Sequence, residues 1–330
     1  MKLYGYIRNR ALKAAITAVT CLFSLGVIHS AVAGVPDQRP LFLVAPVKPI
    51  LMLAMTDAIT GVLRTLADTE DVVKVLYYGE QGTGKTLDLA TLGRLGPIIF
   101  VNAEGGIKKR PLRIFDVPPE NIILEPATSY EQLEGLYWKL RRQIEADDPS
   151  RPVGINFDSL TEITTTLAEV ATMRRVHGAK EKADALGIVP ESEKINPFRT
   201  ALDDYGIMTV QMRHLARRFR DLPMHVGFSA LSKRDVDASG GGEAGDVVTY
   251  RPALTPAFGN DIRGYVDIVV ATKVASDGRY VGITKPRYGL MGKDRFGALP
   301  VTMVDPTFER IIAIINDELD PDECRWVPES

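Results

Sequence analysis

Residues 79–86 read Gly-Glu-Gln-Gly-Thr-Gly-Lys-Thr, which is the complete pattern G-x-x-x-x-G-K-T. An apolar run rich in β-branched and aromatic residues, 72–78, precedes it, and a helix-compatible stretch, 86–94, follows it. The three glycines allow successive backbone N–H groups to point inward, and the helix that follows adds the positive end of its dipole. This segment therefore constrains the fold to a strand, an anion-binding turn and a helix.

Such a loop binds the phosphates of a nucleotide. We expect Lys85 to reach the β- and γ-phosphates and the hydroxyl of Thr86 to bind Mg²⁺. We therefore predict that ATP and Mg²⁺ are the cofactors and that the loop residues bind the nucleotide, namely Gly79, Glu80, Gln81, Gly82, Thr83, Gly84, Lys85 and Thr86.

From residue 56 onward, strand-like and helix-like segments alternate, which predicts an α/β fold with a mostly parallel central sheet flanked by helices. The expected strands are 72–78, 97–102, 121–124, 153–157, 224–229, 268–272 and 279–284. The expected helices are 130–144 (with Ser129 as N-cap), 161–173, 197–221 and 305–319. Two stretches break the alternation, a charged insertion at 174–196 and a polar, glycine-rich loop at 233–264.

Acidic residues follow two of the predicted strands. Asp158 ends the fourth strand, a position that suits the second magnesium contact of an enzyme with such a phosphate loop. The next residue is Ser159, so the base that activates water must come from elsewhere. Glu104 follows the second strand, and strand ends converge on one crevice in a parallel sheet. We therefore expect Glu104 near the γ-phosphate, with Glu162 as a weaker rival.

At this point the chain resembles the RecA-type ATPase core. The resemblance rests on an ordered set of segments: 79–86, Phe-Val-Asn-Ala-Glu at 100–104, 121–124 followed by 130–133, and Asp158-Ser159. It implies that Glu104 positions the attacking water. Residues 293–297, Lys-Asp-Arg-Phe-Gly, look like the Lys-Asn-Arg-Phe-Gly motif of RadA. The resemblance implies that Lys293 and Arg295 reach the γ-phosphate of a neighbouring subunit.

Overall, the chain resembles the short phage ATPases of the Sak type over about residues 57–317, and the first fifty or so residues have no counterpart in that family. That resemblance implies ATP hydrolysis at subunit interfaces of a homo-oligomer, ring or filament, in phage DNA recombination and single-strand annealing. In two respects the chain departs from the pattern. Asn156 interrupts the apolar strand before Asp158, and the fifth strand ends near Ser229 and Ser232 where the family often has a glutamine or histidine sensor.

Single-stranded DNA is the partner that the resemblance implies, because the two irregular stretches occupy the places of the family's DNA-binding loops. Cations there would add salt-sensitive phosphate contacts. Tyr250, Arg251 and Phe258 could add stacking and charge. The net charge of −2 argues against a purely electrostatic nucleic-acid binder and is compatible with a local basic groove. Cys21 and Cys324 form no disulfide framework or zinc spacing.

The N-terminus conflicts with an intracellular ATPase. Basic residues precede an apolar stretch at 14–28, and Ala-Val-Ala at 31–33 resembles a signal cleavage site. We expect residues 1–55 to be a signal-like or spurious segment and 56–330 to form the RecA-like ATPase domain, with a true start near Met52 or Met55. The protein is then cytoplasmic and has no stable membrane association. The alternative is an exported or membrane-tethered NTPase.

A second alternative keeps the fold and changes the activity. Because the usual sensor residue is missing, the chain could be a nucleotide-gated DNA-binding or annealing protein with little hydrolysis. ATP turnover with and without single-stranded DNA separates this hypothesis from a DNA-stimulated ATPase.

Overall fold

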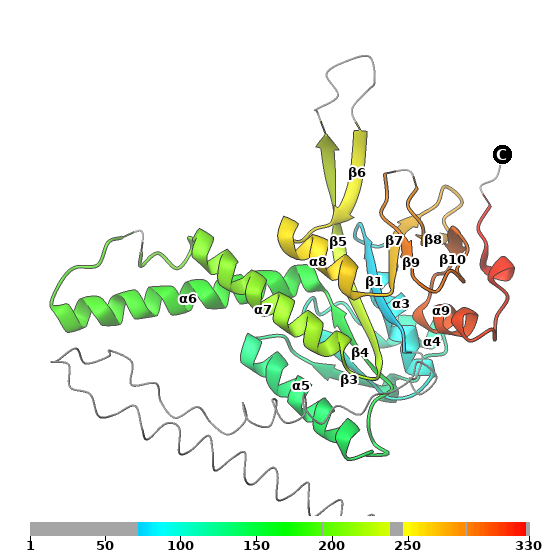
Figure 1. Ribbon diagram of the computed structural model, residues 1–330, viewed down its shortest axis with the longest axis horizontal. Helices are drawn as coiled ribbons and strands as arrows, with labels where there is room; N and C mark the ends of the chain where they lie inside the picture. The colour runs from blue at the N-terminus through cyan, green and yellow to red at the C-terminus, as the bar shows by residue number, and fades with distance from the viewer. Residues whose placement is uncertain (1–71, 193, 238–246, 288, 328–330) are drawn as a thin grey trace, which may run out of the picture. The chain divides into compact units, whose positions relative to one another are not determined.

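The strands of the described residues form one ten-stranded sheet in the order β10-β8-β7-β1-β5-β4-β2-β3, with β6 paired to β5 and β9 to β7. A computed structural model describes residues 72–192, 194–237, 247–287 and 289–327 (Figure 1). The predicted N-terminal segment 1–55 and the expected domain start at residue 56 lie outside these residues.

The centre of the sheet is parallel. It comprises β7 (Ile268–Val274), β1 (Lys74–Gly79), β5 (His225–Asp237), β4 (Gly154–Asp158), β2 (Ile98–Asn102) and β3 (Ile122–Glu125). The antiparallel strands are β6 (Val247–Pro252), β8 (Tyr280–Ile283), β9 (Lys293–Asp294) and β10 (Thr302–Val304). All seven predicted strands are present; six have bounds within two residues of those expected, and β5 continues eight residues past its expected end at residue 229. The predicted α/β fold class is confirmed.

Helices cover both faces of this sheet. One face carries α5 (Tyr130–Glu145), α6 (Leu160–Leu186), α7 (Leu202–Arg220) and α8 (Pro256–Tyr265), and the other carries α3 (Lys85–Ala90), α4 (Lys109–Ile114) and α9 (Phe308–Ile315). Each face has its own hydrophobic core, because alternate residues of a strand point to opposite faces. In β1, Leu76 and Tyr78 belong to the first core and Val75 and Tyr77 to the second.

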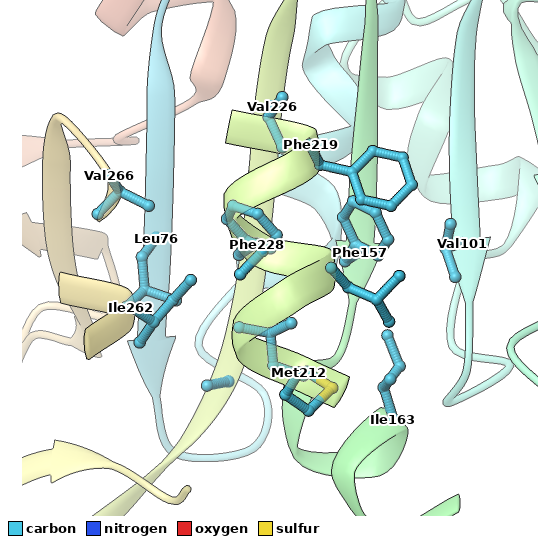
Figure 2. Packing of buried hydrophobic residues seen from close by; sticks show 14 of the residues in the cluster. Leu76, Val101, Phe157, Ile163, Met212, Phe219, Val226, Phe228, Ile262 and Val266 are labelled. Carbon is cyan, nitrogen blue, oxygen red and sulfur yellow. The ribbon is translucent and has the colours of Figure 1, made fainter. Parts of the chain in front are cut away.

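The first core shows why α7 forms: Met208, Met212, Leu215 and Phe219 make one apolar stripe along the helix, and all four are buried. Met212 and Phe219 project from α7 onto the sheet, where Phe219 lies against Phe157 of β4 with ring centroids 4.8 Å apart (Figure 2). Ile262 of α8 lies beside Leu76 on the same face. Aromatic pairs at such separations add to the free energy of area burial. The methionine-bearing stripe of α7 is therefore core.

The prediction of a charged insertion at 174–196 was wrong for the first half of that segment. Residues 174–186 continue α6, which the sequence interpretation ended at Met173. The segment contains no proline, and the helix ends where Gly187 adopts a left-handed φ of 62°. Arg175 then holds the connection to α7, since its guanidinium contacts Asp204 and donates to the carbonyls of Lys194 and Arg199.

The prediction of a loop at 233–264 was also wrong, because most of its described residues belong to strands and a helix. β5 continues to Asp237 and pairs antiparallel with β6, so that the two strands form a hairpin that extends beyond the carboxyl edge of the sheet (Figure 1). Residues 256–265 form α8, which begins with Pro256 in its first turn. Phe258, expected to stack on bases, is completely buried. The glycine-rich residues 239–242 lie outside the described residues.

Candidate functional site: a phosphate loop at the carboxyl edge of the sheet

The phosphate loop connects β1 to α3 at the carboxyl edge of the sheet. Its tight path explains two of the glycines. Gly84, with φ of 89°, has a left-handed conformation that side chains disfavour. A Cβ atom at Gly79 would lie 2.3 Å from the Oγ1 atom of Thr272 on β7, so only glycine fits there. Thr83 and Thr272 join the loop to β7 through a 2.8 Å contact between their hydroxyl oxygens.

Lys85 is curled beneath the loop. Its Nζ atom donates to the carbonyl oxygens of Glu80 at 2.6 Å and Gly79 at 3.0 Å, and only 8% of the residue is exposed. Burial lowers the pKa of Lys85, and the nearby carboxylates of Glu104 and Asp158 partly oppose this effect. The ammonium group is therefore held where the loop turns, next to the acidic side of the site.

Thr86 and Asp158 meet as the sequence predicts. The Thr86 hydroxyl donates to Oδ2 of Asp158 at 2.8 Å, although β5 separates the strands that lead to them. The other carboxylate oxygen, Oδ1, accepts from the hydroxyl of Ser229 at 2.5 Å. Burial raises the pKa of Asp158, which the hydrogen bonds from Ser229 and Thr86 partly offset. Ser229 thus lies within β5, where the strand passes Asp158, and touches Asp158 directly, whereas Ser232 lies further along β5 in the hairpin.

Glu104 lies at the same place. The hydroxyl of Ser159 donates to its Oε1 atom, and the N–H groups of Ala103 and Glu104 donate to the Asp158 carbonyl at 2.8 and 3.2 Å. Its side chain is exposed, so it is open to solvent beside the buried Asp158. Glu162 lies in the first turn of α6, where its N–H group donates to the Ser159 hydroxyl at 3.4 Å. The geometry places Glu104 at the site and Glu162 one helical turn away.

Asn102 is a member of the site that the sequence interpretation did not single out. It pairs in register with Asp158, so the two side chains point to the same face of neighbouring strands. Its Oδ1 atom is buried and has no hydrogen-bond partner within the described part of the chain. The polar residue at the end of a buried strand, two positions before Glu104, was the signal that could have identified it.

These oxygens fit a magnesium ion. A hydroxyl, a carboxylate and an unpaired amide oxygen are hard ligands, and Mg²⁺ binds through one or two carboxylates together with substrate phosphates. No group of three His, Cys, Asp or Glu side chains that could hold a metal by itself occurs within the described residues. Thr86 and Asp158 are the residues that would hold the ion, and the unpaired oxygen of Asn102 belongs to the residue in register with Asp158 on the neighbouring strand.

Asn156, the polar residue within the apolar strand β4, joins this strand to a helix. Its side chain is completely buried, and its Nδ2 atom donates to the carbonyl oxygen of Leu89 in α3 at 2.9 Å. The strand that presents Asp158 is thereby joined to the helix that carries Lys85 and Thr86.

Lys293 and Arg295 lie at the opposite edge of the sheet within one chain. β9 pairs with the amino end of β7, whereas the phosphate loop meets its carboxyl end. Lys293 Nζ donates to the carbonyls of Val266 and Arg263 at 2.6 and 2.9 Å, and Arg295 pairs with Asp267 at 2.7 Å. Both cations hold the end of α8 against the sheet. Their contact with a neighbour's nucleotide stays a prediction.

A cavity of about 370 Å³ lies between the phosphate loop and the hairpin. It is lined by loop residues, by residues 272–274 of β7, by Ser232 and Tyr250 of the hairpin, and by Leu290. Tyr250 also links the hairpin to the sheet, because its carbonyl accepts from the Tyr78 hydroxyl at 3.3 Å. The hairpin base and the phosphate loop therefore share a surface.

Comparison with known families agrees with this geometry. A family model described as an AAA domain matches residues 71–296, and the chain belongs to that family. The family is one of P-loop ATPases, which implies ATP binding and, in most cases, Mg²⁺. A comparison with curated proteins finds no match. Among the described residues, no helix has the length and apolar character needed to cross a bilayer.

Proposed function

We propose that this chain is a RecA-type ATPase of the Sak kind that hydrolyses ATP and acts on single-stranded DNA in phage-type recombination or annealing. The observation that carries the proposal is the convergence of Thr86, Asp158 and Glu104 beside Lys85 at one edge of the sheet. The match of residues 71–296 to the AAA domain family supports the nucleotide-binding part of the proposal.

In the proposed reaction, water attacks the γ-phosphate in line with the leaving oxygen. Lys85 and the loop N–H groups hold the phosphates. Glu104 accepts a hydrogen bond from the attacking water and orients it, while the Ser159 hydroxyl fixes the carboxylate of Glu104. A magnesium ion held by Thr86 and Asp158 would supply electrostatic stabilisation of the charge that develops on the phosphates.

The variant Glu104→Gln tests this assignment. The amide keeps the size of the side chain but is a poor acceptor of a proton, so we expect ATP hydrolysis to fall by roughly 10² or more. ATP affinity should change by no more than about twofold, because Glu104 does not belong to the phosphate loop. Steady-state turnover and nucleotide titration measure the two effects.

The matched control is Glu162→Gln, which removes the rival carboxylate one turn into α6. It should retain nearly full turnover. Normal turnover in Glu104→Gln together with a loss in Glu162→Gln would reverse the assignment of the two residues.

Head-to-tail assembly is the second part of the proposal, with Lys293 and Arg295 completing the site of a neighbouring subunit. Arg295→Ala and Lys85→Ala proteins should each be inactive. Mixing them should restore part of the activity, since some interfaces then combine an intact loop with an intact cation. Turnover as a function of mixing ratio measures this rescue.

The control for the mixing experiment is Asp267→Asn, which removes the partner of Arg295 within the same chain but keeps the cation. It should stay active if Arg295 acts on a neighbour. An absence of rescue at every ratio, with Asp267→Asn as inactive as Arg295→Ala, would instead assign Arg295 a purely structural role.

A second candidate function is a nucleotide-gated DNA-binding protein with little hydrolysis. It is favoured by Ser229, which is bonded to Asp158 at the position where a longer sensor side chain is usual. The exposed cations Lys233 and Arg234 of the hairpin support DNA contact in either case. Strong stimulation of turnover by single-stranded DNA favours the motor, and unchanged slow turnover favours the gated binder.

A further inference from the structure

Tyr280 lies directly against the phosphate loop. It begins β8 and pairs with Val274 at the carboxyl end of β7, which places it at the edge of the sheet where the loop turns. A Cβ atom built on Gly84 would lie 3.3 Å from its Cδ1 atom and 3.7 Å from its Cε1 atom. Because Gly84 has no side chain, the ring rests on the loop backbone itself.

The backbone of Tyr280 is fixed, while its ring is partly open to solvent. Its carbonyl accepts from the N–H group of Asp305 at 2.8 Å, and the strand pairing holds it on the other side. The residue is nevertheless 40% exposed, although the rest of β8 is buried. An aromatic face is therefore available at the rim of the phosphate site.

The strand order determines which end of a nucleotide would meet this ring. β8 and β4 lie on opposite sides of β1, with β7 and β5 between. Asp158 and Glu104 mark the γ-phosphate end on the β4 side. A triphosphate with its terminal phosphate there and its middle phosphate in the loop directs the ribose and base away from β4, toward β7 and β8.

We propose that Tyr280 is the stacking platform for the base of the bound nucleotide and that it makes the site favour purine nucleotides. This inference rests on the proposed function, since it requires a nucleotide in the loop. Base–aromatic stacking contributes substantially to nucleotide affinity, and any base can take part in it. A purine covers more of the ring than a pyrimidine does, so the gain is larger for ATP and GTP than for CTP.

The experiment compares ATP, CTP and inorganic tripolyphosphate as ligands in the presence of Mg²⁺, with affinities measured by calorimetry on the full chain. Tyr280→Ala should weaken ATP binding by roughly 5- to 100-fold. It should weaken CTP binding less, and it should leave tripolyphosphate binding unchanged because that ligand has no base. Tyr280→Phe keeps the ring and should bind ATP within about twofold of the wild type.

Tyr205→Ala is the matched control, because Tyr205 is 46% exposed and lies on α7. It should bind all three ligands like the wild type. Unchanged ATP affinity in Tyr280→Ala overturns the stacking role, and so does an equal loss for ATP and tripolyphosphate, which would mean that the ring only supports the loop. If wild-type protein binds neither ATP nor tripolyphosphate, the proposed function itself fails, and the two failures are thus distinguishable.

Discussion

Asn156 illustrates how one buried polar residue connects the two halves of the site. Its amide donates to the carbonyl of Leu89, so that α3 and β4 are fixed relative to one another. Its Oδ1 atom lies 2.2 Å from where a Cβ atom at Gly227 would be, which means that β5 approaches closely only because residue 227 is a glycine. A side chain that looks like a defect in an apolar strand therefore positions Lys85 and Thr86 relative to Asp158.

The variant Asn156→Ala should lower the free energy of unfolding by about 1–3 kcal/mol, the cost of losing a buried hydrogen bond to a backbone carbonyl. ATP affinity should fall as well, since α3 loses this contact with β4. Urea unfolding and nucleotide titration measure the two effects. Asn316→Ala, at the exposed end of α9, is the control and should change stability by less than about 0.5 kcal/mol. Equal stability of both variants would contradict the role of Asn156.

At the scale of elements, sequence patterns predicted which helices and strands form better than they predicted where those helices and strands end. The helix α5 follows its pattern closely, because Leu133, Leu136 and Leu140 recur on one face and Ser129 caps the first turn by accepting from the Gln132 N–H group. α6 extends thirteen residues past Met173 because local composition allowed helix to continue, and nothing before Gly187 stops it.

The anchor of the α6–α7 connection could not be predicted from periodicity. Asp204 is 1% exposed and accepts hydrogen bonds from the Thr172 hydroxyl at 3.1 Å and the Arg175 guanidinium at 3.0 Å. Burial by itself raises the pKa of Asp204, but the hydrogen bonds from Ala201, Arg175 and Thr172 outweigh it and leave the pKa lowered. Contacts of Asp204 with two residues of α6, 29 and 32 positions away in sequence, thus decide how a charged stretch packs.

The hairpin of β5 and β6 was missed for a related reason. Lys233, Arg234 and Asp235 look like loop residues, yet they continue β5 and pair with Arg251, Tyr250 and Thr249 of β6. A two-stranded ribbon beyond the sheet has no buried face to impose an apolar alternation, so the usual strand signal is absent.

At the scale of the whole molecule, the carboxyl and amino ends of the sheet strands carry different kinds of residues. The carboxyl edge carries the phosphate loop, Asp158 and Glu104. The amino edge carries buried groups that join strands: the Val73 N–H group donates to His225 Nδ1 at 3.1 Å, and the ammonium group of Lys74 donates to the carbonyls of Leu222 and Met224. Burial, with a further contribution from the charge of Lys74, lowers the pKa of His225 to about 4.

This shift predicts a pH dependence of stability. Between pH 6.5 and about 4 the unfolded chain protonates His225 while the folded chain does not, so stability falls as the pH falls through this window. The loss attributable to His225 reaches up to about 3 kcal/mol. His225→Asn keeps an acceptor for the Val73 N–H group without titrating, and its unfolding free energy should fall less steeply over the same window.

Denaturant unfolding at several pH values measures this slope. His177→Asn is the control, because the His177 side chain is 76% exposed and should leave the slope unchanged. Identical pH profiles for wild type and His225→Asn would show that His225 does not govern the acid response.

The sequence alone determined the phosphate loop and the succession of strands and helices. It also predicted that four polar residues lie together at one end of the sheet: Lys85, Thr86, Asp158 and Glu104. Those features are local: glycine freedom, side-chain period and strand-end chemistry act over a few residues. Only the tertiary structure joined Ser229 to Asp158 and Asn156 to Leu89, set Asn102 in register with Asp158, and brought Tyr280 against Gly84. Each of these contacts depends on which strands lie side by side, and the order of strands in a sheet is decided by packing between segments far apart in the chain.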